Sequence, residues 1–415
     1  MAHRPRDYFR RIALLLAMLI SGGSLVLPRV PMLALMLILA ALAGAKVFKV
    51  RRKVLPVLAV LAAILVLTLL RPAGVQFDSL VIRFANFGAG FVLLELYLAS
   101  GRVALWNDLR VIVRPMAYQA IATIVAGEIA KFLFVPFDIE GSPYSYYTFL
   151  GVLNYHELHV RWVADRIGPV RPDGFFFEPG ILQIYLNLYL YLALFVFRSK
   201  RQALLAAMAV LATQSTAGLV TSLILIASFL ATEYVIRGSL AARVLKTVGG
   251  LIILTPLIVV VALNVTEKLS GDLRGSFWAR QYDLETGLNV IAANPLLGIG
   301  FDYKDYYGAA GRLGDSDTPL GASLTRDRGN TNGLVFLVYS VGIPLSIPFL
   351  IGIFRQRLFP HRLLVGSALS LFLMAESMIF TPFFLMILFS GMCYQSQRRS
   401  PAGAVAANAR AQRSG

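Results

Sequence analysis

Charged residues and cysteine are both scarce in this sequence. Asp, Glu, Lys and Arg together make up 15% of the 415 residues, whereas they make up about a quarter of an average soluble domain. The only cysteine is Cys393, which excludes an internal disulfide and a cysteine-ligated metal cluster. Hydrophobic residues make up 57% of the chain, and the mean hydropathy is +0.70. This composition excludes an ordinary soluble protein and indicates an integral membrane protein.

Long apolar stretches recur along the whole chain, separated by short basic or longer polar connections. A bilayer core about 30 Å thick needs roughly 20 apolar residues per helix, and about twelve stretches come near that length. We therefore predict an all-α polytopic fold with a single membrane domain over residues 1–415. The predicted spans are 11–27, 30–48, 54–71, 80–99, 112–136, 174–197, 203–215, 217–236, 244–264, 333–354, 363–380 and 381–394.

Basic residues predict the orientation of these spans. The net charge is +17, and Lys and Arg gather in every second connection, from Arg4–Arg11 to Arg398–Arg413. By the positive-inside rule these connections face the cytoplasm, so both termini are predicted to be cytoplasmic and no nucleic acid is expected as a partner. The first span is interpreted as an uncleaved anchor, because no small-residue cleavage pattern follows it. Residues 395–415 are predicted to form a disordered cytoplasmic tail.

Two long polar segments, residues 137–173 and 265–332, are predicted to face outward. Between 150 and 167 the first segment has one mixed polar and aromatic face, which is interpreted as a short helix at the membrane interface. His156 and His159 within it have an HxxH spacing. Without a third ligand, they are interpreted as ordinary polar-face histidines and not as a metal site.

The second polar segment predicts a helix over 279–293 that ends at Asn294-Pro295, with a flexible turn at Gly298 and Gly300. Residues 1–110 are interpreted as scaffold, and snorkelling towards the headgroups explains Arg83 in the fourth span. Nearly all outward polar sequence therefore lies between 137 and 332. Transporters usually show matching broken helices in two halves, so this asymmetry favours an enzyme.

The segment Arg171 to Ile181, RPDGFFFEPGI, puts a carboxylate at the start of an apolar span. Pro179 can occupy the first helical position because it gives up no hydrogen bond there. Glu178 is therefore predicted at the N-cap or in the first turn. Two interpretations of its carboxylate remain open: a structural cap favoured by the helix dipole, or a desolvated general base.

Four stretches carry motifs that occur together in one family. They are RPDGFFFEPGILQIYLNL, LATQSTAGLVTSLI, GSFWARQYDLETGLNVIAANPLLGIG and GNTNGLVFLVYSVGIPLSI. The first is similar to an R-x-x-G-x-x-x-E-P entry into a span, and the third to a GS-x3-R run that ends in NP-x-x-G-x-G. Over about residues 170–350 the chain resembles the O-antigen polymerase and ligase family of bacterial inner-membrane glycosyltransferases.

The chain departs from the family pattern at two positions. Many relatives have an Arg directly after the Ser of the turn motif, whereas Ser215 is followed by Thr216. The ligases carry a His before the Asn that begins the fourth motif, whereas Thr331 precedes Asn332. The missing His weakens the ligase interpretation, and the E-P signature favours a polymerase.

The resemblance implies a GT-C-like membrane enzyme of the bacterial inner membrane. Such a polymerase transfers an undecaprenyl-diphosphate-linked glycan chain onto a lipid-linked repeat at the periplasmic face, in O-antigen, capsule or exopolysaccharide synthesis. The expected partners are lipid-linked oligosaccharide repeats, membrane lipids and a chain-length regulator. An O-antigen ligase is the alternative within the family, and a lipid-linked oligosaccharide flippase is the alternative from another class.

The resemblance also implies the site residues. Glu178 is the expected general base, with Asp272 a poor second choice, and Arg280 is the first choice for gripping the diphosphate, since guanidinium groups bind phosphate oxygens bidentately. No cofactor is expected and the transferase is predicted to be metal-independent, because the acidic sequence 315–317 is interpreted as solvated surface. The further expected substrate-binding residues are Arg171, Arg274, Arg326, Arg328 and Asn332.

Overall fold

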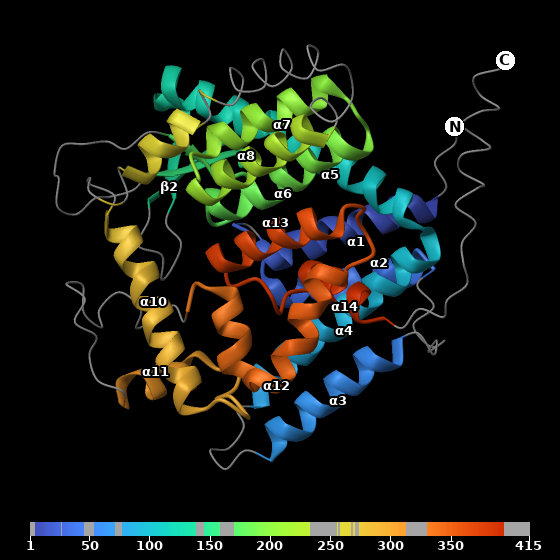
Figure 1. The fold of residues 1–415 in the computed structure, drawn as a ribbon. Helices are drawn as coiled ribbons and strands as arrows, with labels where there is room; N and C mark the ends of the chain where they lie inside the picture. The colour runs from blue at the N-terminus through green and yellow to red at the C-terminus, as the bar shows by residue number, and fades with distance from the viewer. Residues whose placement is uncertain are drawn as a thin grey trace, which may run out of the picture.

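The computed structural model is a bundle of helices with one small sheet (Figure 1). It describes residues 5–25, 27–44, 54–70, 77–137, 145–157, 170–232, 255, 258–266, 269, 274–312 and 330–393. The helices of the first half are α1 (Pro5–Gly22), α2 (Arg29–Leu42), α3 (Leu55–Leu69), α4 (Phe77–Ser100) and α5 (Arg102–Ile129). Those of the second half are α6 (Pro179–Tyr191), α7 (Lys200–Thr213), α8 (Thr216–Leu230), α10 (Arg274–Ala293), α11 (Tyr303–Arg312), α12 (Gly333–Arg355), α13 (Arg362–Ala375) and α14 (Pro382–Met392).

Four described helices are long and apolar enough to cross a membrane: Leu80–Ser100, Arg102–Ile129, Pro179–Val196 and Gly333–Arg355. Five shorter apolar helices accompany them within the described part of the chain, namely α2, α3, α8, α13 and α14. Together they indicate a multi-pass membrane protein. The count of about twelve spans stays a prediction, and the predicted span 244–264 lies mostly outside the described residues.

The helices form two groups around a buried centre (Figure 1). Helices α5, α6, α7 and α8 pack together, while α4 and α12 pack on α14. Helix α14 lies deepest, since every residue from Phe383 to Phe389 is fully buried. Helix α6 is buried along nearly its whole length and continues as a π-helix, η3 (Leu192–Val196). Both central helices begin with a proline at their first helical positions, as the missing N–H allows.

The apolar pattern predicts a span that starts at residue 112. In the structure, helix α5 begins ten residues earlier, at Arg102. The basic stretch at its start is helical because it is amphipathic: Leu105, Leu109 and Val113 recur every fourth residue and are buried. Arg102, in the first turn, and Arg114 are both exposed. A polar helical turn is invisible to a search for purely apolar runs, which explains the wrong boundary.

The all-α prediction is wrong in the first polar segment, which contributes a four-stranded antiparallel sheet in the order β1-β2-β3-β4. The strands are β1 (Val135–Phe137), β2 (Ser145–Phe149), β3 (Leu153–Glu157) and β4 (Arg171–Pro172). The helix predicted over 150–167 is also wrong up to residue 157, and residues 158–169 lie outside the described part.

Cross-strand aromatic pairing explains the sheet. Tyr147 stacks on Tyr155 with ring centroids 5.1 Å apart, and Phe134 packs edge-on against Tyr155 at 5.0 Å. Tyr147 and Tyr155 are directly opposed on β2 and β3, and such cross-strand pairs stabilise a sheet. The connecting turn contains Leu150 and Gly151, both with positive φ, which ends any helix there.

The NP-x-x-G-x-G motif forms a loop that docks on a break in α12. Helix α10 ends at Ala293, as predicted, and Gly298 and Gly300 both have positive φ. The Ile299 N–H donates to the Tyr339 carbonyl at 2.7 Å, and the Ile343 N–H donates to the Pro295 carbonyl at 2.8 Å. These carbonyls and N–H groups are available because α12 loses its helical geometry at Gly342 (φ 80°). The motif is therefore a backbone-to-backbone clamp.

At one end of the bundle, the segment that leads into α6 and contains Glu178 lies next to the α1–α2 turn, and the end of α1 contacts the start of α14. The Leu25 N–H, in the α1–α2 turn, donates to the Phe175 carbonyl ahead of α6 at 3.2 Å. The Phe383 N–H at the start of α14 donates to Ser21 Oγ at 3.1 Å. The opposite end holds the buried Asp108 carboxylate, which Arg10 and Arg11 contact at 2.6 and 3.0 Å. We call the end with the α1–α2 turn and the start of α6 the Glu178 end.

We predict that Gly298→Ala destabilises the fold by about 1–3 kcal/mol, because a Cβ there would lie 2.5 Å from the Tyr339 carbonyl oxygen. Gly151→Ala is the matched control, since Gly151 has a similar φ of 69° but open space around it. Thermal unfolding midpoints in detergent measure both variants. Equal losses would mean that backbone strain alone, and not the clamp, fixes Gly298.

Candidate active site at the Glu178 end

Glu178 occupies the N-cap position of α6, as predicted. Its backbone is extended (φ −148°, ψ 146°), and its carbonyl accepts the first helical hydrogen bond from the Ile181 N–H at 3.0 Å. The half-buried side chain, however, makes no capping hydrogen bond. Pro179 follows directly, so the first helical N–H is missing. The structural-cap interpretation thus holds for the backbone of Glu178 and not for its carboxylate.

Glu376 lies beside Glu178, and the sequence analysis missed it. It follows α13 as the C-cap residue, in the linker 376–381 before α14. Its Oε1 packs against the first turn of α6, only 2.5 Å from where a Cβ on Gly180 would be. The glycine after Glu178-Pro179 is therefore needed for the close approach. A lone acid in an apolar predicted span, FLMAESMIF, was the available signal.

Burial raises the pKa of Glu376 to about 8, and the nearby Glu178 carboxylate adds to this rise. The Arg280 guanidinium acts in the opposite direction and lowers the same pKa. Arg280 is exposed on α10, far from Glu178 in sequence. Both residues predicted to be catalytic are therefore close enough to the Glu376 carboxyl to act on its charge.

Residues 330–333, NTNG, connect the helix of Arg280 to the linker of Glu376. Thr331 donates to Asp283 Oδ2 through its N–H at 3.0 Å and its hydroxyl at 2.6 Å. Asp283 is buried one helical turn after Arg280 on α10. Two residues beyond Thr331, a Cβ on Gly333 would lie 2.7 Å from the Glu376 carbonyl oxygen. This segment thus holds α10 and the linker in a fixed relation.

Asn332 and Asn330 in the same segment are committed to local structure. Asn332 Oδ1 accepts from the N–H groups of Leu334 and Val335, both at 3.1 Å, and so caps α12. The Asn330 amide donates to the Asp283 carbonyl at 2.5 Å and to the Tyr306 hydroxyl at 3.1 Å. The oxygen of Asn332, a predicted substrate-binding residue, therefore already has a structural function.

Arg171 lies in β4, and both Arg171 and Glu178 act electrostatically on the nearby Asp173. Its Nε donates to the Thr213 carbonyl at 3.3 Å, which joins the R-x-x-G motif to the Ser-containing α7–α8 turn. Asp173, two residues on, is buried and contacts His156 Nδ1 at 2.7 Å. Burial raises the pKa of Asp173 to about 6, while His156 and Arg171 lower it. His156 is thus the partner of a buried carboxylate.

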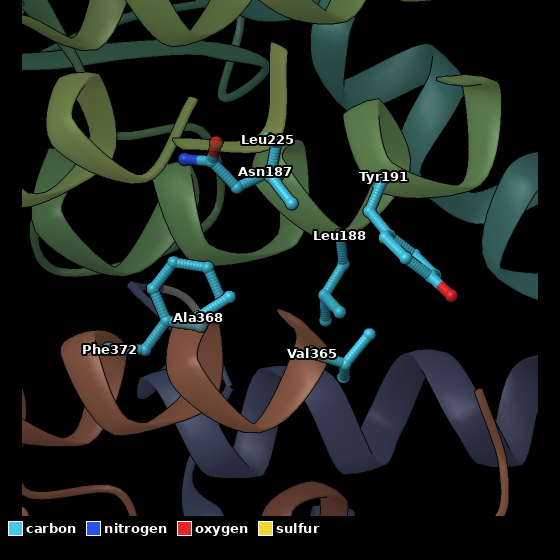
Figure 2. Close-up of a pocket in the computed structure, with 7 residues that line it drawn as sticks. All are labelled: Asn187, Leu188, Tyr191, Leu225, Val365, Ala368 and Phe372. Carbon is cyan, nitrogen blue, oxygen red and sulfur yellow. The ribbon is translucent and has the colours of Figure 1, made fainter. Parts of the chain in front are cut away.

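The α7–α8 turn also packs directly on α6. A Cβ on Gly218 would lie 2.9 Å from the Gln183 side chain, and the Asn187 amide donates to the Gly218 carbonyl at 3.1 Å. Beyond this contact, Asn187, Leu188 and Tyr191 face α13 across a small pocket (Figure 2). Apart from Asn187 and Tyr191 its lining is apolar, so we interpret the pocket as a packing gap behind the site.

The remaining predicted residues lie at or beyond the edge of the described structure. Arg274 begins α10, but its side chain is outside the described part. Arg326, Arg328, Asp272 and residues 315–317 are outside it altogether. Within the described residues, no three His, Cys, Asp or Glu side chains come together as possible metal ligands.

We predict that Glu376→Gln removes a pH-dependent loss of stability. In the unfolded chain this carboxyl ionises from its ordinary pKa of 4.5, whereas burial keeps it protonated in the fold up to about pH 8. Wild-type stability should therefore fall between these pH values, by at most about 1.4 kcal/mol per pH unit. The unfolding midpoint of Glu376→Gln should gain on wild type from pH 5 to pH 8. Glu285→Gln, on α10, is the control, and an equal gain there would contradict the assignment.

Comparison with known proteins identifies one family. The model of the family described as O-antigen ligase matches residues 202–323, which include the Ser-containing turn and the NP-x-x-G-x-G loop. No curated protein and no solved structure matches the chain. Members of this family are enzymes that act on lipid-linked glycans in membranes. The match agrees with the resemblance found in the sequence: residues 202–323 are similar to the O-antigen ligase family, which supports a function in polysaccharide processing, and the apolar helices indicate a multi-pass membrane protein.

Proposed function

We propose that the protein is a metal-independent polysaccharide polymerase. It transfers an undecaprenyl-diphosphate-linked glycan chain onto a lipid-linked repeat at the periplasmic face of the inner membrane. The observation that carries the proposal is the position of Glu376, whose carboxyl is influenced by both Glu178 and Arg280. A candidate base and a candidate diphosphate-binding cation, from segments about a hundred residues apart in sequence, thus both lie within electrostatic range of one carboxyl group.

The proposed reaction is a displacement at the anomeric carbon of the donor. Glu178 takes the proton of the acceptor hydroxyl, whose oxygen forms the new glycosidic bond. The bond between the anomeric carbon and the diphosphate oxygen breaks, and its electron pair leaves on the diphosphate. Arg280 stabilises that growing negative charge, with Arg171 in β4 and Arg274 at the start of α10 as further cations.

Glu376 supports this reaction by remaining protonated at neutral pH. Its raised pKa means that the pair of carboxyl groups carries less negative charge than two carboxylates would. An anionic diphosphate can then approach with less repulsion. A protonated carboxyl can also donate a hydrogen bond, so Glu376 can orient Glu178 or the acceptor hydroxyl.

A polymerase is favoured over a ligase by the residue before Asn332. The ligases have a His there, whereas Thr331 uses both its N–H and its hydroxyl to hold Asp283. An imidazole at that position would have to replace this anchor. The flippase alternative accounts less well for a carboxylate pair next to a cation at one end of the bundle.

The proposed orientation places the Glu178 end in the periplasm and both termini in the cytoplasm. Arg10, Arg11 and Arg355 mark the opposite end, as the positive-inside rule requires. The two polar segments, 137–173 and 265–332, then belong to the periplasmic side. The cytoplasmic tail over 395–415 lies outside the described residues, and the chain-length regulator stays a prediction.

Deleting the gene and separating the cell's glycans on a gel tests the class of function. A product limited to a single repeat supports the polymerase. Loss of surface glycan with accumulated lipid-linked polymer would instead indicate a ligase. Repeats retained on the inner leaflet would indicate a flippase.

We predict that Glu178→Gln and Arg280→Ala each leave the protein inserted in the membrane but abolish polymer, because one removes the base and the other the charge that stabilises the leaving group. Glu285→Gln and Arg201→Ala are matched controls on the surfaces of α10 and α7 and should give normal polymer. Glycan gels and membrane immunoblots measure both effects. Full-length polymer at normal yield from either site variant would refute that residue's role.

A further inference from the structure

Arg29 lies at the Glu178 end, beside the residue that precedes Glu178. It begins α2, and its Nη2 is 3.4 Å from where a Cβ on Gly23 would be. The Phe177 ring reaches within 2.4 Å of the same point. Arg29 and Phe177, together with Ser24, Leu25, Leu27 and Pro28, line an open groove of about 460 Å³. The groove is therefore lined by Phe177, the residue directly before the proposed base Glu178.

Arg83 brings a second guanidinium to the same region, one turn inside the apolar span of α4 that begins at Leu80. Its guanidinium carbon lies 5.1 Å from the centre of the Phe336 ring. It interacts electrostatically with Arg29, Tyr339 and Asp302. A charged residue within an apolar span calls for a functional explanation. Snorkelling alone would direct Arg83 to the headgroups and not onto an aromatic ring of α12.

Neither guanidinium forms an ion pair with a carboxylate in the described part of the chain. Asp302, an acidic residue that acts electrostatically on Arg83, accepts a hydrogen bond from the Lys304 N–H at 2.7 Å, at the start of α11. Two cations held within electrostatic range repel each other. An anion bound between them would remove that cost.

We propose that Arg29 and Arg83 form an anion site for the diphosphate of a lipid-linked glycan. The proposal rests on the proposed function and extends it to the N-terminal helices, which sequence analysis had assigned to the scaffold. Guanidinium groups suit this ligand because their planar N–H pairs match phosphate oxygens. The Phe177 ring next to Arg29 belongs to the same segment as Glu178, so a bound diphosphate would be close to the proposed base.

The apolar side chains around Arg29 explain why the ligand would be a lipid and not a free phosphate. The groove beside Arg29 is also lined by Leu25, Leu27, Pro28 and Phe177. Leu27 and Val30, close to Arg29 in sequence, are exposed. A lipid with its phosphates at Arg29 can lay the start of its chain against these apolar side chains.

Binding of glycan-free undecaprenyl diphosphate to the full-length protein in nanodiscs tests the site without requiring transferase activity. We expect Arg29→Gln and Arg83→Gln each to weaken binding about tenfold, because each removes one phosphate contact. Arg29→Lys and Arg83→Lys should recover part of the affinity, and Arg201→Gln should bind like wild type. Unfolding midpoints verify that each variant is folded.

Unchanged affinity in both Gln variants would overturn the site. An equal loss of binding to phosphatidylglycerol would also overturn it, because the arginines would then hold ordinary lipid headgroups. Equal competition by inorganic diphosphate would exclude the role of the lipid chain. If Glu178→Gln still made polymer while Arg29→Gln lost lipid diphosphate, the proposed base would fail and the anion site would stand.

Discussion

The contact of the Glu376 carboxyl with the first turn of α6 is the constraint on which the functional end depends. It is possible only because Gly180 has no side chain, and Gly333 gives the backbone of Glu376 the same freedom on the side of α12. Helices α6, α12, α13 and α14 therefore converge on one linker. A carboxyl group surrounded in this way loses its water, which explains its raised pKa and its sensitivity to Glu178 and Arg280.

Family motifs acquire distinct physical functions in this arrangement. The NP-x-x-G-x-G loop clamps the break in α12, and Thr331, just before α12, ties α10 to α12 through Asp283. The R-x-x-G-x-x-x-E-P segment is the exception, because it combines a structural N-cap backbone with a carboxylate that makes no capping bond. Most of the recognisable sequence thus builds the framework, and fewer residues are left to carry the chemistry.

The electrostatics of the two ends differ in kind. At the far end, the buried Asp108 is neutralised by Arg10 and Arg11 and hydrogen-bonded by Tyr97, a closed network that needs no ligand. At the Glu178 end, the cations Arg29 and Arg83 repel each other, and Arg280 acts on the charge of the Glu376 carboxyl group. Charges arranged this way are suited to a substrate that brings its own negative charge.

The sequence alone determined the features that follow from local chemistry. Pro179 places Glu178 at the N-cap because proline lacks an N–H, and Asn294-Pro295 ends α10 for a related reason. Apolar length located most of the helices. Only the tertiary structure decided that Glu376 faces Glu178, that Arg83 lies on Phe336, and that aromatic pairs turn the first polar segment into a sheet. These outcomes depend on contacts between residues far apart in the chain, which no local pattern of hydrophobicity or charge encodes.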